Sequence, residues 1–327
     1  MAPTEFLSVL PYVAAAGVFA GLYLLRRHVR GQDCRSDARL DGKTAIVTGA
    51  NSGIGRAAAQ ELAARGARVI LACRDMTKAE TAASDIRQAT GNGNVVAGKL
   101  DLSSLASVRE FADHVNREEE RLDILINNAG VMWCPKQYTA DGFELQFGVN
   151  HLGHFLLTHL LLDLLTCSAP SRVVTVSAVG HAHANIDFDN LNGEKSYSPF
   201  QANFQSKLAN ALFSRELARR TRGTGVTALS LDPGPVRTDI ARHMPTTLGP
   251  VLYAPFWLVM QLIQPIVKTP RQGAQTVVHC AVAEGLEECS GMYFSNCAPA
   301  EPAPQAKDDA VAKRLWEVSE AMVGIRS

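Results

Sequence analysis

The body of the chain repeats one pattern, in which a short apolar, β-branched run is followed by a longer segment of helical composition. The runs predict buried strands at 44–48, 69–73, 95–100, 122–126, 172–176 and 226–231. The first helices are predicted at 56–65, 78–89 and 104–119, between these strands. Strands with few charges, separated by helices, are typical of a parallel sheet buried on both faces. The pattern therefore predicts an α/β fold built on a doubly wound parallel sheet.

The first thirty residues follow a different pattern. Residues 6–25 carry no charge, and as a helix rising about 1.5 Å per residue they would span roughly 30 Å, the thickness of a bilayer's hydrocarbon. The basic cluster 26–30 follows this run, so the positive-inside rule places the body on the cytosolic side. We predict an uncleaved transmembrane anchor with a basic flank over 1–30.

Two other interpretations of this N-terminal run fit less well. A cleaved signal peptide would carry its basic residues before the apolar run, and a mitochondrial presequence would be richer in Arg and Ser. We therefore expect the anchor to hold the body on an endoplasmic reticulum membrane, with a mitochondrial membrane as the alternative.

A second uncharged stretch, 244–267, contains Pro245, Pro250, Pro255 and Pro265. Prolines interrupt helices, which disfavours a second membrane span. We expect either an apolar lid over a substrate pocket or a surface that dips into a membrane interface. Both interpretations point to an apolar substrate or a membrane neighbour.

Composition narrows the functional classes. The 327 residues balance 32 basic against 32 acidic side chains, which excludes the broad positive field of a nucleic-acid binder. The 46% of apolar residues excludes a largely disordered chain. Seven scattered cysteines indicate reduced thiols, and their spacing predicts no metal site. We expect one domain at 42–297, with residues 298–327 packed on it as a C-terminal extension; the oligomeric state is left open.

A glycine-rich turn follows the first predicted strand and opens the first helix. It contains Gly49, Ser52, Gly53, Ile54 and Gly55. Glycines allow the backbone to turn tightly and to approach a pyrophosphate, whose charge the free N–H groups of a helix start can bind. The turn could be purely structural, but the order of strand, turn and helix favours dinucleotide binding.

The end of the second predicted strand bears on which dinucleotide is bound. An acidic residue at this place usually holds the ribose 2′-hydroxyl of NAD. Here the strand ends in Cys73-Arg74, with no carboxylate before Asp75. Arg74 could neutralise the 2′-phosphate of NADP or could simply be a solvated side chain. We favour NADP(H) over NAD(H).

Four further motifs come in a characteristic order. They are NNAG at 127–130, GVNHLGHF at 148–155, SKLAN at 206–210, which we expect to begin a helix, and PGPVRT at 233–238. Together they resemble the short-chain dehydrogenase/reductase family over about 42–297, which implies a Rossmann-type sheet. The segments VMWCP (131–135), DGFE (141–144), SGMYF (290–294) and KRLW (313–316) are similar to the retinol dehydrogenase branch.

The resemblance implies a set of cofactor and catalytic residues. Besides the glycine turn and Arg74, the cofactor would contact Asp101, Asn128, Ala129, Pro233, Gly234, Val236 and Thr238. Lys207 would bind the nicotinamide ribose and lower the pKa of a neighbouring phenol. Asn150 would hold a water in the proton path. The substrate would be a retinoid or a similar lipid alcohol or aldehyde.

Two catalytic positions depart from the family. The tyrosine expected one helical turn before Lys207 is replaced by Asn203, and the substrate-orienting serine by Ala178. Ser177 precedes this position by one residue and should point to the other face. Tyr197 is expected in the preceding loop.

An asparagine amide donates a hydrogen bond but does not exchange a proton near neutral pH. Histidines could substitute as the acid, and His151, His154 and His181 are the candidates. Two functions therefore compete: an NADP(H)-dependent oxidoreductase with reduced activity, and a pseudoenzyme that binds NADP(H) and acts as a sensor, scaffold or apolar-ligand binder.

Overall fold

The computed structural model describes residues 26, 29–264 and 266–325, so the anchor predicted at 6–25 lies outside the described residues. An eight-stranded sheet runs through the molecule in the order β3-β2-β1-β4-β5-β6-β7-β8. The strands are β1 (Thr44–Thr48), β2 (Arg68–Cys73), β3 (Val95–Lys99), β4 (Ile124–Asn127), β5 (Ser171–Val176), β6 (Val226–Asp232), β7 (Tyr293–Ser295) and β8 (Ala298–Ala300). Only β7 and β8 pair in antiparallel fashion. The strand order reverses direction at β1, as in a doubly wound Rossmann-type sheet.

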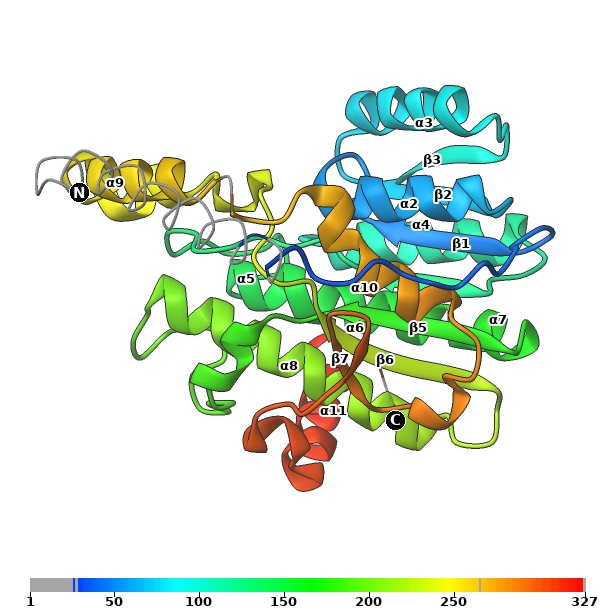
Figure 1. The fold of residues 1–327 in the computed structure, drawn as a ribbon. Helices are drawn as coiled ribbons and strands as arrows, with labels where there is room; N and C mark the ends of the chain where they lie inside the picture. Colours follow the sequence, from blue (N-terminus) through cyan, green and yellow to red (C-terminus); the bar gives the residue numbers. More distant parts are fainter. Residues whose placement is uncertain (1–25, 27–28, 265, 326–327) are drawn as a thin grey trace, which may run out of the picture.

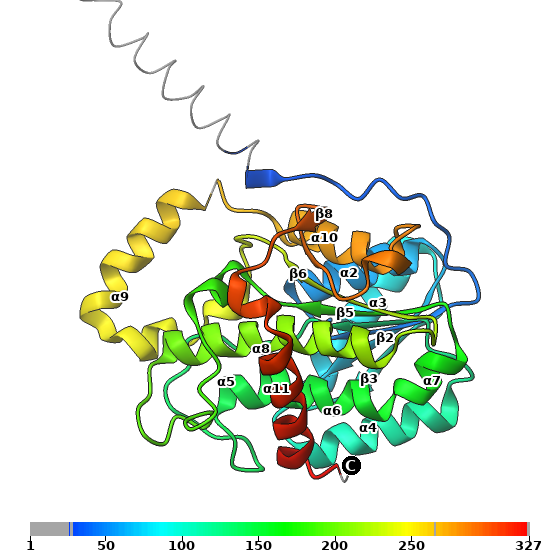
Figure 2. The same ribbon diagram turned by 90° about the horizontal axis from the view of Figure 1, so that it is seen from below.

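Helices cover both faces of this sheet (Figure 2). One layer holds α2 (Gly53–Ala64), α3 (Met76–Thr90) and α10 (Pro270–Val282), and the other holds α4 (Leu105–Glu118), α6 (Gly153–Leu160) and α8 (Pro199–Arg220). Successive strand residues enter different cores: Ile46 packs in the core under α8, and Val47 in the core under α2. This alternation places both strand faces out of water, which explains the uncharged strand sequences.

Most predicted elements lie where the pattern put them, but several boundaries differ. The helix α2 begins at Gly53 rather than at 56, and β4 begins at Ile124 rather than at 122. The prediction that a helix begins at Ser206 is wrong, because α8 begins at Pro199. Ser198 Oγ accepts the Gln201 N–H and proline occupies the first turn, so the helix start is fixed seven residues earlier. The three-residue strands β7 and β8 were too short to predict.

The uncharged stretch at 244–267 forms α9 (Met244–Ile263), which projects from the body (Figures 1 and 2). The chain is interrupted at Gly249, where φ is 68° and ψ is 167°. The expectation that prolines break this stretch into pieces is therefore confirmed directly before Pro250 and is wrong for Pro255. Pro250 follows the break and occupies the first turn of the second piece, where a missing N–H breaks no hydrogen bond, and the helix continues through Pro255.

The C-terminal segment packs on α8. Its helix α11 (Asp309–Met322) buries Trp316, whose ring lies 4.8 Å from Phe155 and 5.7 Å from Phe213 between centroids. The Arg220 guanidinium lies over the same ring at 4.5 Å. The segment thus contributes side chains to the core under α8.

Candidate functional site

The glycine turn lies at the carboxyl end of β1, against the loop that follows β4. Gly49 has φ of 67°, and a Cβ placed on it would come within 3.0 Å of Ala129. A Cβ on Gly55 would come within 2.5 Å of Asn128 Nδ2. The two loops therefore approach each other closely enough to require glycine at these positions.

Thr48, at the end of β1, joins the same two loops and was not singled out by sequence. Its Oγ1 accepts the N–H groups of Asn128 and Ala129, both at 2.9 Å, and lies 2.8 Å from His154 Nε2. Asn128 Nδ2 in turn donates to Thr48 O at 2.8 Å. Hydrophobic periodicity cannot mark such a residue, because its role depends on a strand that is distant in sequence.

The start of α2 is left open to a ligand. Ser52 is its N-cap residue, but the side chain makes no capping hydrogen bond. Gly53 has φ of 56°, and a Cβ on it would come within 3.1 Å of the Thr238 methyl group, while Ile54 packs toward the core under α2. The uncapped N–H groups and the positive end of the helix dipole thus face the loop after β6, which suits an anionic group.

The loop after β6 is held by a second buried lysine that sequence reasoning missed. Lys268 Nζ donates to Pro233 O at 3.0 Å, and a Cβ on Gly234 would lie 3.0 Å from this Nζ. Val236 forms a parallel bridge with Lys268. Burial lowers the pKa of Lys268, while Asp232 opposes this shift. The only signal in the sequence is that Lys268 is the first charge after the stretch 244–267.

The ends of β2 and β3 supply the residues expected near the adenosine. Arg74 is exposed, and its positive charge contributes, after burial and Arg242, to lowering the pKa of His243. Asp75 instead caps α3 by accepting the Lys78 N–H. Asp101 Oδ1 accepts the N–H and the hydroxyl of Ser103 at 3.0 and 2.6 Å. Arg74 therefore remains the charged side chain available at the end of β2.

Lys207 lies on α8 and reaches the carboxyl end of β5. Its Nζ donates to Val176 O at 3.3 Å, and burial lowers its pKa to about 8 against the opposing effect of Asp232. Asn203 is buried one turn earlier on the same helix, and its amide donates to Val131 O at 3.3 Å. The position of the family's phenol is thus filled by an amide that already has a backbone partner.

Asn150 is positioned by a π-helical turn, Gly148–Leu152. Its Oδ1 accepts the Val131 N–H at 2.8 Å, and its Nδ2 donates to Val131 O at 3.0 Å and to Ser206 Oγ at 2.9 Å. Its backbone oxygen lies 3.0 Å from His154 Nδ1. Asn150 therefore fixes the backbone at Val131, which we call the 131 segment, and the Asn203 amide donates to the same carbonyl oxygen.

The serine position offers no hydroxyl to a substrate. Ala178 follows β5 and is half-buried. Ser177 is buried, and its hydroxyl donates to Lys207 O at 2.7 Å. Ser177 is thus engaged with the backbone of α8 and does not replace the missing group.

No phenol within the described residues makes a hydrogen bond to Lys207. Tyr197 lies in the loop before α8, as expected, and its hydroxyl donates to Cys134 O at 2.8 Å and lies 3.2 Å from Glu144 Oε1. Tyr293, on β7, packs its ring 4.9 Å from His181. Burial raises the pKa of both tyrosines above the ordinary value. Both phenols therefore stay protonated, and the Tyr197 hydroxyl is engaged by Cys134 O and Glu144 rather than by Lys207.

The three candidate histidines are committed elsewhere. Burial lowers the pKa of His151 to about 3 and that of His154 to about 4, so both are neutral at pH 7. His151 Nε2 lies 2.9 Å from Ser319 Oγ. His181 Nε2 accepts the Ala303 N–H, so its Nδ1 carries the proton and donates to Ala178 O. None of the three is placed to supply a proton to a substrate.

Comparison with known proteins identifies the family of this chain. A family model described as short chain dehydrogenase matches residues 43–248. The chain is 51% identical to human retinol dehydrogenase 12 over 99% of this chain and 97% of that protein, and 51% identical to human retinol dehydrogenase 13 over 98% and 96%. The chain belongs to the short-chain dehydrogenase/reductase family, in its retinol dehydrogenase-like branch.

Solved structures share the fold. An uncharacterised protein from Mycobacterium paratuberculosis is 37% identical, with a TM-score of 0.72 over 90% of this chain and 98% of that one. The NADP complex of RhlG from Pseudomonas aeruginosa is 27% identical, with a TM-score of 0.61 over 78% and 95%. Membership of this family implies a nicotinamide cofactor.

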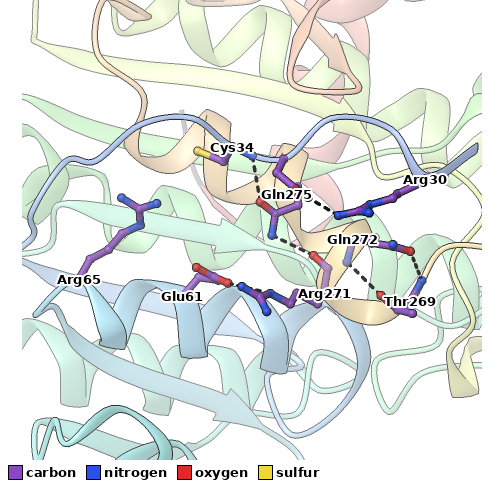
Figure 3. A pocket seen from close by; sticks show the side chains of 9 residues that line it. Arg30, Cys34, Glu61, Arg65, Thr269, Arg271, Gln272 and Gln275 are labelled. Carbon is purple, nitrogen blue, oxygen red and sulfur yellow. Dashed lines mark hydrogen bonds and ion pairs between the residues drawn. The ribbon is translucent and has the colours of Figure 1, made fainter. Parts of the chain in front are cut away.

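The residues present fit such a cofactor. The glycine turn has no room for side chains at Gly49 and Gly55, and the first turn of α2 is uncapped. By contrast, the polar pocket in Figure 3 lies outside this site, where the segment after Arg30 crosses α2 and α10. The described residues therefore fit a nucleotide, but the position of the family's tyrosine lacks a group for proton transfer.

Proposed function

We propose that this chain is a membrane-anchored, NADP(H)-dependent oxidoreductase acting on a retinoid or similar lipid alcohol or aldehyde, at a rate limited by proton transfer. The observation that carries the proposal is the combination of a nucleotide cradle, by which we mean the glycine turn 49–55 with the uncapped start of α2, and Asn203 one turn before Lys207. A nicotinamide cofactor supplies or accepts the hydride.

The cradle assigns roles to the remaining residues. The first turn of α2 would hold the pyrophosphate, and the loop 233–238 the nicotinamide end. Lys207, buried and with its pKa lowered to about 8, would bind the ribose hydroxyls. Asn150 would keep the 131 segment, and with it the wall of the site, in place.

The position one turn before Lys207 lacks a group that can transfer a proton. The Asn203 amide can donate a hydrogen bond to a substrate oxygen but cannot give up a proton. General acid–base catalysis is typically worth about 10²–10⁴-fold, or roughly 3–5 kcal/mol of barrier. The absence of a hydroxyl at Ala178 removes a further polarising hydrogen bond. Slow turnover through water is the activity that these residues support.

The preference for NADP(H) is proposed from Arg74. Its guanidinium is exposed at the end of β2, whereas the neighbouring carboxylate of Asp75 caps α3. A positive group here suits a 2′-phosphate. The Pseudomonas aeruginosa relative RhlG, which was solved as a complex with NADP, supports the same choice.

The substrate class and the membrane location are proposed from the relatives' names and from the sequence. Retinol dehydrogenases 12 and 13 align over nearly the whole chain, and the uncharged run 6–25 is followed by the basic cluster 26–30. We place the body on the cytosolic side, at the endoplasmic reticulum in the first instance.

A pseudoenzyme that binds NADP(H) as a sensor, scaffold or apolar-ligand binder is the second candidate. It is favoured by the loss of both proton-handling groups, at Ala178 and Asn203, while Tyr197 and the buried histidines have other partners. This candidate shares the cradle and differs only in turnover.

One preparation of the full chain distinguishes the candidates. Calorimetric titration measures NADPH binding, and the same sample is assayed for reduction of all-trans-retinal. Binding with slow but measurable turnover supports the oxidoreductase. Binding without turnover supports the pseudoenzyme, and the absence of NADPH binding contradicts both.

A further inference from the structure

The helix α9 presents an apolar surface that no other described element covers. Met244 is its one buried residue, and beyond the break at Gly249 large apolar side chains are exposed. These are Val251, Leu252, Trp257, Leu258, Val259 and Leu262, with Val251 and Leu262 exposed by 83% and 70%. A surface of this kind on a helix that projects from the body marks an interaction site (Figure 2).

The length of this surface argues against a membrane span. By composition and total length α9 could cross a bilayer. However, the backbone at Gly249 is non-helical, so the continuous piece runs from Pro250 to Ile263. At about 1.5 Å per residue this piece is roughly 21 Å long, shorter than the 30 Å of hydrocarbon in a bilayer. It fits the plane of an interface better than a perpendicular path.

The N-terminal segment joins the body on the same side. The side chains of Arg30 and Thr269 line one pocket, and Thr269 follows the end of α9 by six residues (Figure 3). The segment is fixed there, because the Gln32 N–H donates to Asn296 Oδ1 at 2.6 Å and the Cys34 N–H to Gln275 Oε1 at 2.9 Å. The chain after Arg30 therefore joins the body near the C-terminal end of α9.

The other end of α9 forms part of the wall of the candidate site. Thr247 Oγ1 donates to Trp133 O at 2.5 Å, and the Trp133 ring lies 5.1 Å from that of Phe200 at the start of α8. Trp133 follows Val131, the backbone partner of Asn203, by two residues. The helix thus connects its exposed apolar surface to the segment 131–133, which contacts Asn203.

Charge near α9 favours lipid over protein as the occupant. The stretch 244–267 carries no charge, and the exposed Arg237 and Arg242 outnumber Asp239 in the segment that leads into it. Arg237 Nη1 donates to Gln264 Oε1 at 3.4 Å, which places its positive charge at the far end of the helix. The apolar side chains suit the acyl region of a bilayer, and the flanking arginines suit anionic lipid headgroups.

We propose that residues 250–263 of α9 lie in the interface of a lipid bilayer, with their apolar side chains among the acyl chains. A helix of this kind is buried by about 5–10 Å. The segment 131–133 beside Asn203 then lies close to the lipid, and an apolar substrate could reach the candidate site from the membrane; this last consequence rests on the proposed function.

Fluorescence quenching tests the location of Trp257 without cofactor or substrate. The full chain and its Trp257→Phe variant are mixed with vesicles of phosphatidylcholine and phosphatidylserine, with or without brominated acyl chains. The difference between the two proteins isolates Trp257 from Trp133 and Trp316. We expect brominated lipid to remove most of the Trp257 emission and to leave that of the buried Trp316.

Matched variants separate this surface from other membrane contacts. Leu258→Asp with Leu262→Asp alters two exposed side chains, so the fold should be kept, and we expect quenching of Trp257 to fall several-fold. Met292→Asp, at a 46% exposed residue next to β7, should leave the quenching unchanged.

An unquenched Trp257 overturns the proposal. If cross-linking then joins α9 of two chains, the surface binds a second copy of this chain. If the protein is a monomer instead, α9 acts as a lid. Because no turnover is measured, either result leaves the proposed oxidoreductase function standing.

Discussion

The Lys207 ammonium is buried, and its Nζ donates to one backbone oxygen, Val176 O. Burial lowers its pKa from 10.5 to about 8. Below pH 8 the ammonium is therefore charged in both states, but it is buried in the folded protein and solvated in the unfolded chain. The unfolded state binds more protons between pH 8 and 10.5, so this residue makes stability rise with pH across that window and opposes folding below it.

Replacing Lys207 with Met should therefore stabilise the cofactor-free protein at pH 7. The shift corresponds to a penalty on the order of 3 kcal/mol, which a methionine of similar length would not carry. Thermal unfolding at pH 7 should give a higher Tm than in the native chain, and the gain should shrink toward pH 10.5. An unchanged or lower Tm at pH 7 would show that the ammonium is well solvated. NADPH binding should weaken in the same variant.

Arg74 is the residue on which the cofactor preference depends. Arg74→Glu should weaken NADPH binding by about 10–100-fold, because a charge-assisted hydrogen bond is typically worth about 1.5–3 kcal/mol. Binding of NADH should hold or improve. Lys78→Glu, an exposed change on α3, is the charge-matched control in calorimetry. Equal loss for both dinucleotides would remove Arg74 from the 2′-phosphate site.

Among the elements, the first turn of α2 leaves no room for a side chain at Gly55. A Cβ on Gly55 would lie 2.5 Å from Asn128 Nδ2 and 2.7 Å from Gly49 O, so the two loops would have to separate. Gly55→Ala should lower the free energy of unfolding by about 1–3 kcal/mol and weaken NADPH binding. Gly93→Ala, with nothing within 4 Å of the new Cβ, is the matched control and should change neither quantity in denaturant titration and calorimetry.

Strand and turn chemistry could be predicted at this scale, and the starts of α3 and α4 lie within two residues of the predicted ones, but the start of α8 does not. The β1 run 44–48 and the glycine turn are local patterns, and the structure has them in place. The start of α8 depends on the hydroxyl of Ser198 and on a proline in the first turn, so the helix begins before the motif at 206–210. The π-helical turn at Asn150 has no sequence period of its own and follows from contacts with the 131 segment.

At the scale of the whole molecule, the C-terminal segment contributes to the core. Trp316 packs against Phe155 and Phe213 and lies under Arg220. Trp316→Ala should therefore lower the free energy of unfolding by about 3–5 kcal/mol in denaturant titration. Trp316→Phe retains the ring packing and should recover much of that loss. Equal, small effects from both would mean that α11 docks weakly.

The overall sheet follows from the sequence because its strands are uncharged on both faces, and residues such as Ile46 and Val47 enter opposite cores. The site is predictable only in part. Lys207 and Asn150 belong to sequence motifs and could be predicted. Thr48 and Lys268 could not, because their hydrogen-bond partners are distant in sequence. The same limit applies to Tyr197, whose hydrogen bonds only the fold reveals.

The central claim is that the nucleotide cradle survives while the proton donor beside Lys207 does not. The most direct test measures kcat for all-trans-retinal at saturating NADPH in the Ala178→Ser, Asn203→Tyr double variant. The control is Ala178→Ser, Asn203→Phe, which supplies the ring without the hydroxyl. The account predicts a gain of about 10²–10⁴-fold that requires the hydroxyl. Fast native turnover that the tyrosine leaves unchanged, or an equal gain with phenylalanine, would contradict it.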